Sequence, residues 1–212
     1  MRQLLIATTN PGKVREFREM LGGVGDDFGF RFSDLSRHPG FEPVEETGET
    51  FQDNAILKAH GYATRFDTWA LADDSGLEVD ALDGRPGVHS ARWAAMHGAG
   101  KGDAANNSLL LKQLENVPDE LRTARFVCWL ALADPQGRII LTARGTVEGR
   151  ILRSPRGNNG FGYDPLFLVE AAGRTTAELS PDEKHRISHR GEALRRMRKA
   201  MSTIGVPEDT TP

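Results

Sequence analysis

The chain has 212 residues, of which 38% are hydrophobic, and a single cysteine, Cys128. Its 27 Lys and Arg against 30 Asp and Glu give a formal net charge of -3. This balance argues against a protein that binds nucleic acid through its overall field, because such proteins usually carry a basic excess. One cysteine excludes an intrachain disulfide and a cysteine-based zinc site, and it fits a reducing compartment. With no run of about 18 apolar residues and no secretory signal, we expect a cytoplasmic protein with no membrane partner.

The N-terminal third of the chain predicts a strand followed by two helices. Residues 3–8 are a short apolar run, after which Asn10 is a good N-cap and Pro11 suits the first helical position. The helix is indicated by apolar residues at helical spacing, which are Val14, Phe17, Met20 and Leu21. It is expected to end at Gly22 and Gly23. A second helix, entered through residues 45–50, is indicated by an apolar stripe of Phe51, Ala55, Ala59, Tyr62, Ala63 and Phe66.

The middle of the chain predicts a buried strand and then a loop-rich stretch. The strand covers residues 69–72 and is expected to end where Asp73, Asp74, Ser75 and Gly76 begin. A turn is expected at 83–87, and a glycine-rich loop at 98–102 precedes a helix around 108–114. Polar side chains at the end of a buried strand are candidates for chemistry.

The C-terminal half predicts antiparallel strands and a closing helix. Residues 124–133 and 138–147 form a hairpin, 157–162 are too rich in glycine for regular structure, and 193–201 form a helix. The expected fold is therefore α/β or α+β, with a mixed sheet flanked by helices. We expect one domain over residues 1–207, with two lobes, and a frayed tail at 208–212.

The turn from Thr8 to Lys13 lies where the first strand meets a helix. Free amides and the helix dipole favour a phosphate at such a place, and Lys13 adds a positive charge. Ordinary helix capping with a solvated lysine is the alternative interpretation.

Two acidic pairs lie in separate segments of the chain. Glu45 and Glu46 form one pair and Asp73 and Asp74 the other, and hard oxygen ligands from two segments suit a magnesium ion that carries substrate phosphates. For the glutamates the alternative is a solvated loop before a helix. Asp73 and Asp74 would need a cation or good hydrogen bonds if they are buried.

An aromatic turn and a basic segment complete the candidates. Residues 161–164 combine aromatic faces with a carboxylate, a composition suited to stacking on a flat base, although core aromatics in a turn would look the same. Residues 184–190 concentrate hydrogen-bond donors that suit a base edge or a phosphate, or else form a basic surface at a helix start.

In order and spacing, five segments of the chain resemble the inosine/xanthosine triphosphate pyrophosphatase family: TTNPGK, EETGETFQDNAILKA, LADDSGLEVDALDGRPGVHSARW, FGYDPLF and KHRISHRGEAL. They extend from residue 8 to residue 194 and so cover nearly the whole chain. The resemblance implies hydrolysis of non-standard purine nucleoside triphosphates (ITP, dITP and XTP) to the monophosphate and pyrophosphate, with magnesium, in a homodimer. The implied fold is a long mixed sheet with helices on both sides and two lobes around a nucleotide cleft.

The resemblance also implies a role for each matching residue. Asp74 matches the proton acceptor and one metal ligand, and Ser75 beside it would contact the substrate. Glu45 matches the other metal ligand, with Glu46 as the alternative if the register differs by one. The triphosphate would be held by Thr8, Thr9 (a glycine in many relatives), Asn10, Pro11, Gly12 and Lys13. The base would be enclosed by Phe161, Gly162, Tyr163 and Asp164, and recognised further by Lys184, His189 and Arg190.

Two other functions are alternatives. A pyrophosphatase of the Maf-like relatives would share the general fold but act on pyrimidine or modified nucleotides. A nucleic-acid-binding module would use the C-terminal basic segment but would leave the TTNPGK, EETG and DDSG segments unexplained. We therefore favour the purine triphosphate pyrophosphatase.

Overall fold

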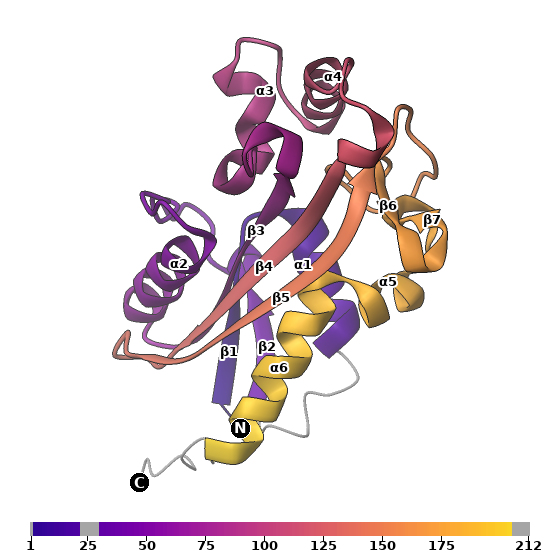
Figure 1. The fold of residues 1–212 in the computed structure, drawn as a ribbon. Coiled ribbons are helices and arrows are strands. Elements are labelled where there is room, and N and C mark those ends of the chain that lie inside the picture. Colours follow the sequence, from indigo (N-terminus) through magenta and orange to yellow (C-terminus); the bar gives the residue numbers. More distant parts are fainter. Residues whose placement is uncertain (1, 22–29, 205–212) are drawn as a thin grey trace, which may run out of the picture. The chain divides into compact units, whose positions relative to one another are not determined.

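A computed structural model describes residues 2–21 and 30–204 of the chain. Its strands form a seven-stranded sheet in the order β2-β1-β3-β4-β5-β6-β7 (Figure 1). The strands are β1 (Arg2–Ala7), β2 (Phe30–Asp34), β3 (Trp69–Val79), β4 (Thr123–Ala133), β5 (Ile139–Ile151), β6 (Phe167–Val169) and β7 (Arg174–Thr175). The helices are α1 (Pro11–Leu21), α2 (Phe51–Phe66), α3 (Trp93–Met96), α4 (Asp103–Gln113), α5 (Pro181–Ile187) and α6 (His189–Ile204).

The sheet is mixed, which confirms the predicted fold class. β1 pairs in parallel with β2 and β3, whereas β6 pairs antiparallel with β5 and β7. No helix within the described ranges has the length and apolarity needed to cross a bilayer. The expected helix end at Gly22 and Gly23 and the expected tail at 208–212 lie outside the described residues.

The chain divides into two compact units, and long strands contribute to both. Unit 1 contains the described residues within 1–74, 128–145 and 190–212. Unit 2 contains residues 75–127 and 146–189. The core of unit 2 is one cluster in which strand residues such as Leu77 and Phe167 pack with Leu110 and Leu114 from the α4 segment.

In unit 1 the alternation of side chains along each strand makes two core layers. Leu4 and Ile6 of β1 pack with side chains of α1 and α6: Phe17, Leu21, Leu194 and Met197. Leu5 and Ala7 pack on the opposite face with α2 residues: Ala55, Ala59, Tyr62 and Ala63. In β3, Leu71 belongs to the α1/α6 layer and Ala72 to the α2 layer.

The prediction that the buried strand ends at Ala72 is wrong, because β3 continues to Val79. Asp73 and Asp74 therefore lie inside the strand, both at most 5% exposed. The alternation of apolar residues resumes after them with Leu77 and Val79, which are fully buried. Since neighbouring strand residues point to opposite faces, Asp73 lies on the α1/α6 face and Asp74 on the α2 face.

Other elements extend beyond their predicted bounds. α4 begins at Asp103 instead of near 108, β5 runs to Ile151, and α6 begins at His189 instead of near 193. A capping box of Ser180 and Glu183 starts a separate helix, α5, before α6. The basic segment at 184–190 is thus helical for the most part.

Candidate active site

The Thr8–Lys13 turn joins β1 to α1, as predicted, and its own side chains cap the helix. Asn10 Oδ1 accepts hydrogen bonds from the amides of Gly12 at 2.9 Å and Lys13 at 3.1 Å. The amide of Asn10 in turn donates to Thr8 Oγ1 at 3.2 Å. Because Asn10 satisfies these first-turn amides, a phosphate here would depend on the Lys13 ammonium and the threonine hydroxyls.

A cavity of about 740 Å³ opens beside this turn within unit 1. Its lining combines residues of the turn with those of α1 and of the following segment: Thr8, Thr9, Pro11, Val14, Arg15, Arg18, Glu19, Asp34, Leu35, Ser36 and Phe41. The cavity therefore borders Thr8, Thr9 and Pro11 of the predicted phosphate turn, whereas Lys13, Asp73 and Asp74 are not among the residues that line it.

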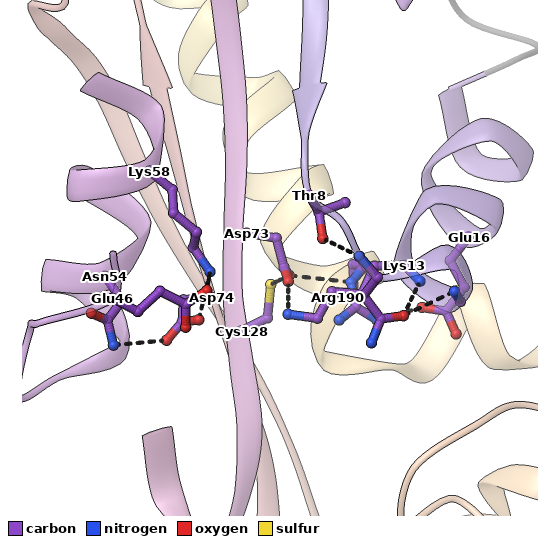
Figure 2. Close-up of polar contacts among 12 residues, drawn as sticks. Thr8, Lys13, Glu16, Glu46, Asn54, Lys58, Asp73, Asp74, Cys128 and Arg190 are labelled. Carbon is purple, nitrogen blue, oxygen red and sulfur yellow. Dashed lines mark hydrogen bonds and ion pairs between the residues drawn. The ribbon is translucent and has the colours of Figure 1, made fainter. Parts of the chain in front are cut away.

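Asp73 lies at the centre of a buried ionic network on the α1/α6 face of β3 (Figure 2). Its Oδ1 pairs with the Lys13 ammonium. Its Oδ2 accepts from Arg190 Nε at 3.2 Å and from the Cys128 thiol at 3.0 Å. The Arg190 guanidinium also pairs with Glu16 of α1. Arg190, predicted to recognise the base, is only 1% exposed and has two carboxylate partners.

The charges in this network are strongly stabilised. Burial alone would raise the pKa of Asp73, but Arg190 and Lys13 outweigh it and hold that pKa well below its usual range. Burial, with the nearby Asp73 carboxylate, raises the pKa of the Cys128 thiol. Cys128 therefore stays protonated and acts as a buried donor, as expected for an inert thiol.

Asp74 points to the opposite face of β3, toward α2 (Figure 2). The Lys58 ammonium donates to Asp74 Oδ1 at 2.7 Å and to Glu46 Oε1 at 3.0 Å. Asn54 Nδ2 lies 3.5 Å from Asp74 Oδ2, at the outer limit of a hydrogen bond. The amide of Gly48 donates to Asn54 Oδ1 at 2.8 Å, so the EETG segment is tied to the start of α2.

The close approach of this segment to α2 explains its glycine. A Cβ at Gly48 would lie 2.6 Å from the Cβ of Asp53 and 2.8 Å from Asn54 Oδ1, which no larger residue could accommodate without a shift. The approach brings Glu46 to Lys58, whereas Glu45 is exposed.

Burial raises the pKa of the Asp74 carboxyl, and the Lys58 ammonium offsets part of that rise. For Lys58, burial alone would lower the pKa, but the carboxylates of Asp74 and Glu46 outweigh it and raise the pKa. A carboxylate with a raised pKa is a stronger base than a solvated one, which suits a general base.

The donors on this face suit a hard cation. In the part of the chain that the structure describes, no cluster of three or more His, Cys, Asp or Glu side chains could hold a metal ion alone. Magnesium, however, is commonly held by one or two carboxylates together with substrate phosphates. Asp74 with a glutamate of the 45–46 pair fits that pattern.

In unit 2 two of the predicted base-binding residues, Phe161 and Lys184, contact a third, Asp164, which is 3% exposed. Its Oδ2 accepts from Lys184 Nζ at 2.6 Å and from the Phe161 amide at 2.8 Å, and its Oδ1 accepts from Thr176 Oγ1 at 2.8 Å. The Lys184 ammonium lies 5.1 Å from the centre of the Phe161 ring. Phe161, Asp164 and Lys184 thus form one connected group.

The remaining predicted residues occupy different surroundings. Tyr163 is buried, and its hydroxyl donates to the Ser90 carbonyl at 3.0 Å. The His189 ring stacks on Phe126 with 4.9 Å between ring centres. Ser75 is half-buried and follows Asp74 on β3.

Comparison with known proteins identifies one family along nearly the whole chain. The Ham1 family profile matches residues 4–200. The chain belongs to the Ham1 family. A dITP/XTP pyrophosphatase from Exiguobacterium sibiricum is 52% identical over 202 residues, or 95% of this chain and 98% of the relative. One from Desulforamulus reducens is 49% identical over 207 residues, or 98% and 99% of the two chains. A solved HAM1 structure from Coxiella burnetii is 40% identical, with a TM-score of 0.82 over 96% of this chain and 100% of that one.

The Ham1 assignment confirms the family that the five segments indicated. The structure places beside Asp74 two residues that the sequence analysis did not single out, Asn54 and Lys58 of α2. Both are buried and fall on the apolar stripe of the helix, at the spacing of Phe51, Ala55 and Ala59. Polar residues at core positions of an amphipathic helix were the signal that marked them.

Proposed function

We propose that this Ham1 chain hydrolyses non-standard purine nucleoside triphosphates, namely ITP, dITP and XTP, to the nucleoside monophosphate and pyrophosphate. The observation that supports this best is the Asp74 site in a chain that belongs to the family over nearly its full length. Relatives about half identical to it are named dITP/XTP pyrophosphatases.

We propose Asp74 and Glu45 as the ligands of a magnesium ion, which would neutralise triphosphate oxygens during the reaction. The donor set fits this proposal, because Asp74 offers a buried carboxylate and Glu45 an exposed one. Lys58 pairs with Asp74 as well as with Glu46, so its ion pairs do not choose between the two glutamates. Glu45→Gln and Glu46→Gln separate the two glutamates. We expect Glu45→Gln to raise the magnesium concentration for half-maximal rate about tenfold, and an effect confined to Glu46→Gln would assign the ligand to Glu46.

The chain's own groups would then do the chemistry. Asp74 would orient and deprotonate the attacking water, and Lys58 would hold its carboxylate in place at 2.7 Å. Lys13 would neutralise charge that develops on the phosphates. The Lys13 ammonium pairs with the buried Asp73 carboxylate, and this ion pair would fix the position of the ammonium before substrate binds.

For the base, we propose that Phe161 provides a stacking face and that Lys184 donates to the oxygen at position 6 of hypoxanthine or xanthine. Adenine has an amino donor at that position, and a buried donor left unpaired costs about 1–3 kcal/mol. Arg190 shares Asp73 with Lys13, so we place its contribution on the phosphate side. Its burial and that of Lys184 weigh against the nucleic-acid-binding alternative, which needs these cations on the surface.

The test is pyrophosphate release from ITP, XTP, GTP, ATP and a pyrimidine triphosphate, with and without magnesium. We expect magnesium-dependent release that is fastest with ITP and XTP. Preference for the pyrimidine would indicate the Maf-like activity instead. A homodimer and a cytoplasmic location remain predictions, which light scattering and cell fractionation would check.

A further inference from the structure

The backbone of Gly162, inside the proposed base-binding loop, is held from both of its polar groups by helix α4. The Gly162 amide donates to Asp103 Oδ2 at 2.6 Å. Its carbonyl accepts from Asn107 Nδ2 at 3.0 Å. The two side chains thus form hydrogen bonds with both the amide and the carbonyl of a single loop residue.

The spacing of Asp103 and Asn107 along α4 allows both side chains to reach Gly162. Asp103 is the first residue of α4 and Asn107 follows four positions later, so both lie on one face of the helix. Gly162 has a φ of +61°, a conformation that favours glycine. A Cβ at Gly162 would meet nothing within 4 Å, so the backbone conformation, and not crowding, requires the glycine.

Separate hydrogen bonds, formed by Asn106, hold helix α4 in place. Asn106 is 2% exposed and points into the preceding segment. Its Oδ1 accepts from the Ala94 amide at 2.8 Å, and its Nδ2 donates to the Ala91 carbonyl at 3.2 Å. These bonds fasten the first turns of α4 independently of the loop.

Other contacts hold the loop on either side of Gly162. The Asn159 amide donates to the Ala177 carbonyl at 3.0 Å, and its side chain donates to the Leu179 carbonyl at 3.0 Å. Asp164 is bound by Lys184 and Thr176. The α4 contacts therefore hold Gly162, in a loop that is also held at Asn159 and at Asp164.

We propose that Asp103 and Asn107 are positioning residues for substrate selection: they hold the Phe161–Asp164 loop in the conformation that receives the purine base. This inference rests on the proposed function. The side-chain hydrogen bonds of Asp103 and Asn107 go to the Gly162 backbone, so we assign these two residues to base binding and not to the chemistry at Asp74.

The expected effect on KM depends on the fraction of molecules in which the loop has the conformation that binds the base. Apparent affinity falls in proportion to the fraction of molecules in which the loop is competent. A hydrogen bond to an ionised acceptor is among the stronger ones, but the anchors at Asn159 and Asp164 remain when it is lost. We therefore expect a rise in KM for ITP of about 3- to 10-fold for Asp103→Ala or Asn107→Ala, with kcat within about 2-fold.

The experiment compares these variants with Asp103→Asn, which keeps an acceptor oxygen, and with Ser108→Ala, an exposed position of the same helix. Besides KM and kcat, it measures product inhibition by inosine monophosphate, which carries the base, and by pyrophosphate, which does not. We expect Asp103→Ala and Asn107→Ala to weaken inhibition by inosine monophosphate alone. Asp103→Asn should recover most of the affinity, and Ser108→Ala should match wild type.

The outcomes separate the two proposals. If wild type releases pyrophosphate from ITP but both alanine variants keep its KM, the positioning role is wrong. The same holds if inhibition by both products weakens equally, because the effect would then not be specific to the base. If wild type releases no pyrophosphate from any purine triphosphate, the proposed function itself fails. Melting temperatures of the variants identify any general loss of structure.

Discussion

Asp73→Asn removes the buried negative charge that Lys13 and Arg190 share. The Asp73 and Arg190 side chains are 0% and 2% exposed, so water cannot replace the lost partner. Breaking a buried ion pair from one side costs about 3–5 kcal/mol. Because Arg190 still pairs with Glu16 in the variant, we expect a loss of unfolding free energy at the lower end of this range, about 3 kcal/mol. For a chain of this size that is a fall in melting temperature of roughly 6–12 °C.

The matched control is Asp83→Asn. Asp83 pairs with Arg85 at 3.1 Å, nearly the 3.2 Å of Asp73 with Arg190, but its side chain is 90% exposed. Its φ of +54° is one that asparagine tolerates. We expect a change within about 0.5 kcal/mol. Urea unfolding followed by tryptophan fluorescence measures both. A loss for Asp73→Asn below about 1 kcal/mol, similar to Asp83→Asn, would refute the reasoning that burial sets the cost.

Three further predictions concern the active site and the loop. Lys58→Met removes the charge that lowers the pKa of Asp74, so the acidic limb of the kcat/KM profile should move up by about 1–3 pH units, while Lys58→Arg should leave it in place. Gly160→Ala puts a Cβ against the Asp164 carboxylate at a φ of +79°, and should cost about 1–3 kcal/mol in urea unfolding and raise KM; unchanged stability would contradict this. A chelator should stop pyrophosphate release, with recovery on added magnesium, yet should shift the melting temperature by less than Asp73→Asn does, because the Asp73 network needs no metal.

Local signals in the sequence were enough to predict α1, α2 and the hairpin of β4 and β5. Asn10 caps α1 through two amides, as its residue type and the following proline indicate. The apolar stripe of α2 predicted most of its buried face, to which the structure adds Asn54 and Lys58. These features depend on residues close in the chain, and the sequence contains them.

The interior of the site could not be predicted in the same way. Two adjacent aspartates read as the end of a strand, because buried carboxylates are uncommon without partners. Their partners come from distant positions: Arg190 for Asp73 and Lys58 for Asp74. Only the fold brings these cations to the strand, and with them β3 can continue through both carboxylates. The same reason explains why Arg190 was predicted to recognise the base and not to pair with Asp73 and Glu16.

The most direct test of the central claim is product analysis of ITP hydrolysis by wild type and Asp74→Asn at saturating magnesium. We predict that wild type forms inosine monophosphate and pyrophosphate in equal amounts. Asp74→Asn should keep its fold by circular dichroism and lose about 10³-fold or more in rate. Wild-type turnover by Asp74→Asn, or a diphosphate and orthophosphate as the products of the wild-type protein, would contradict the account.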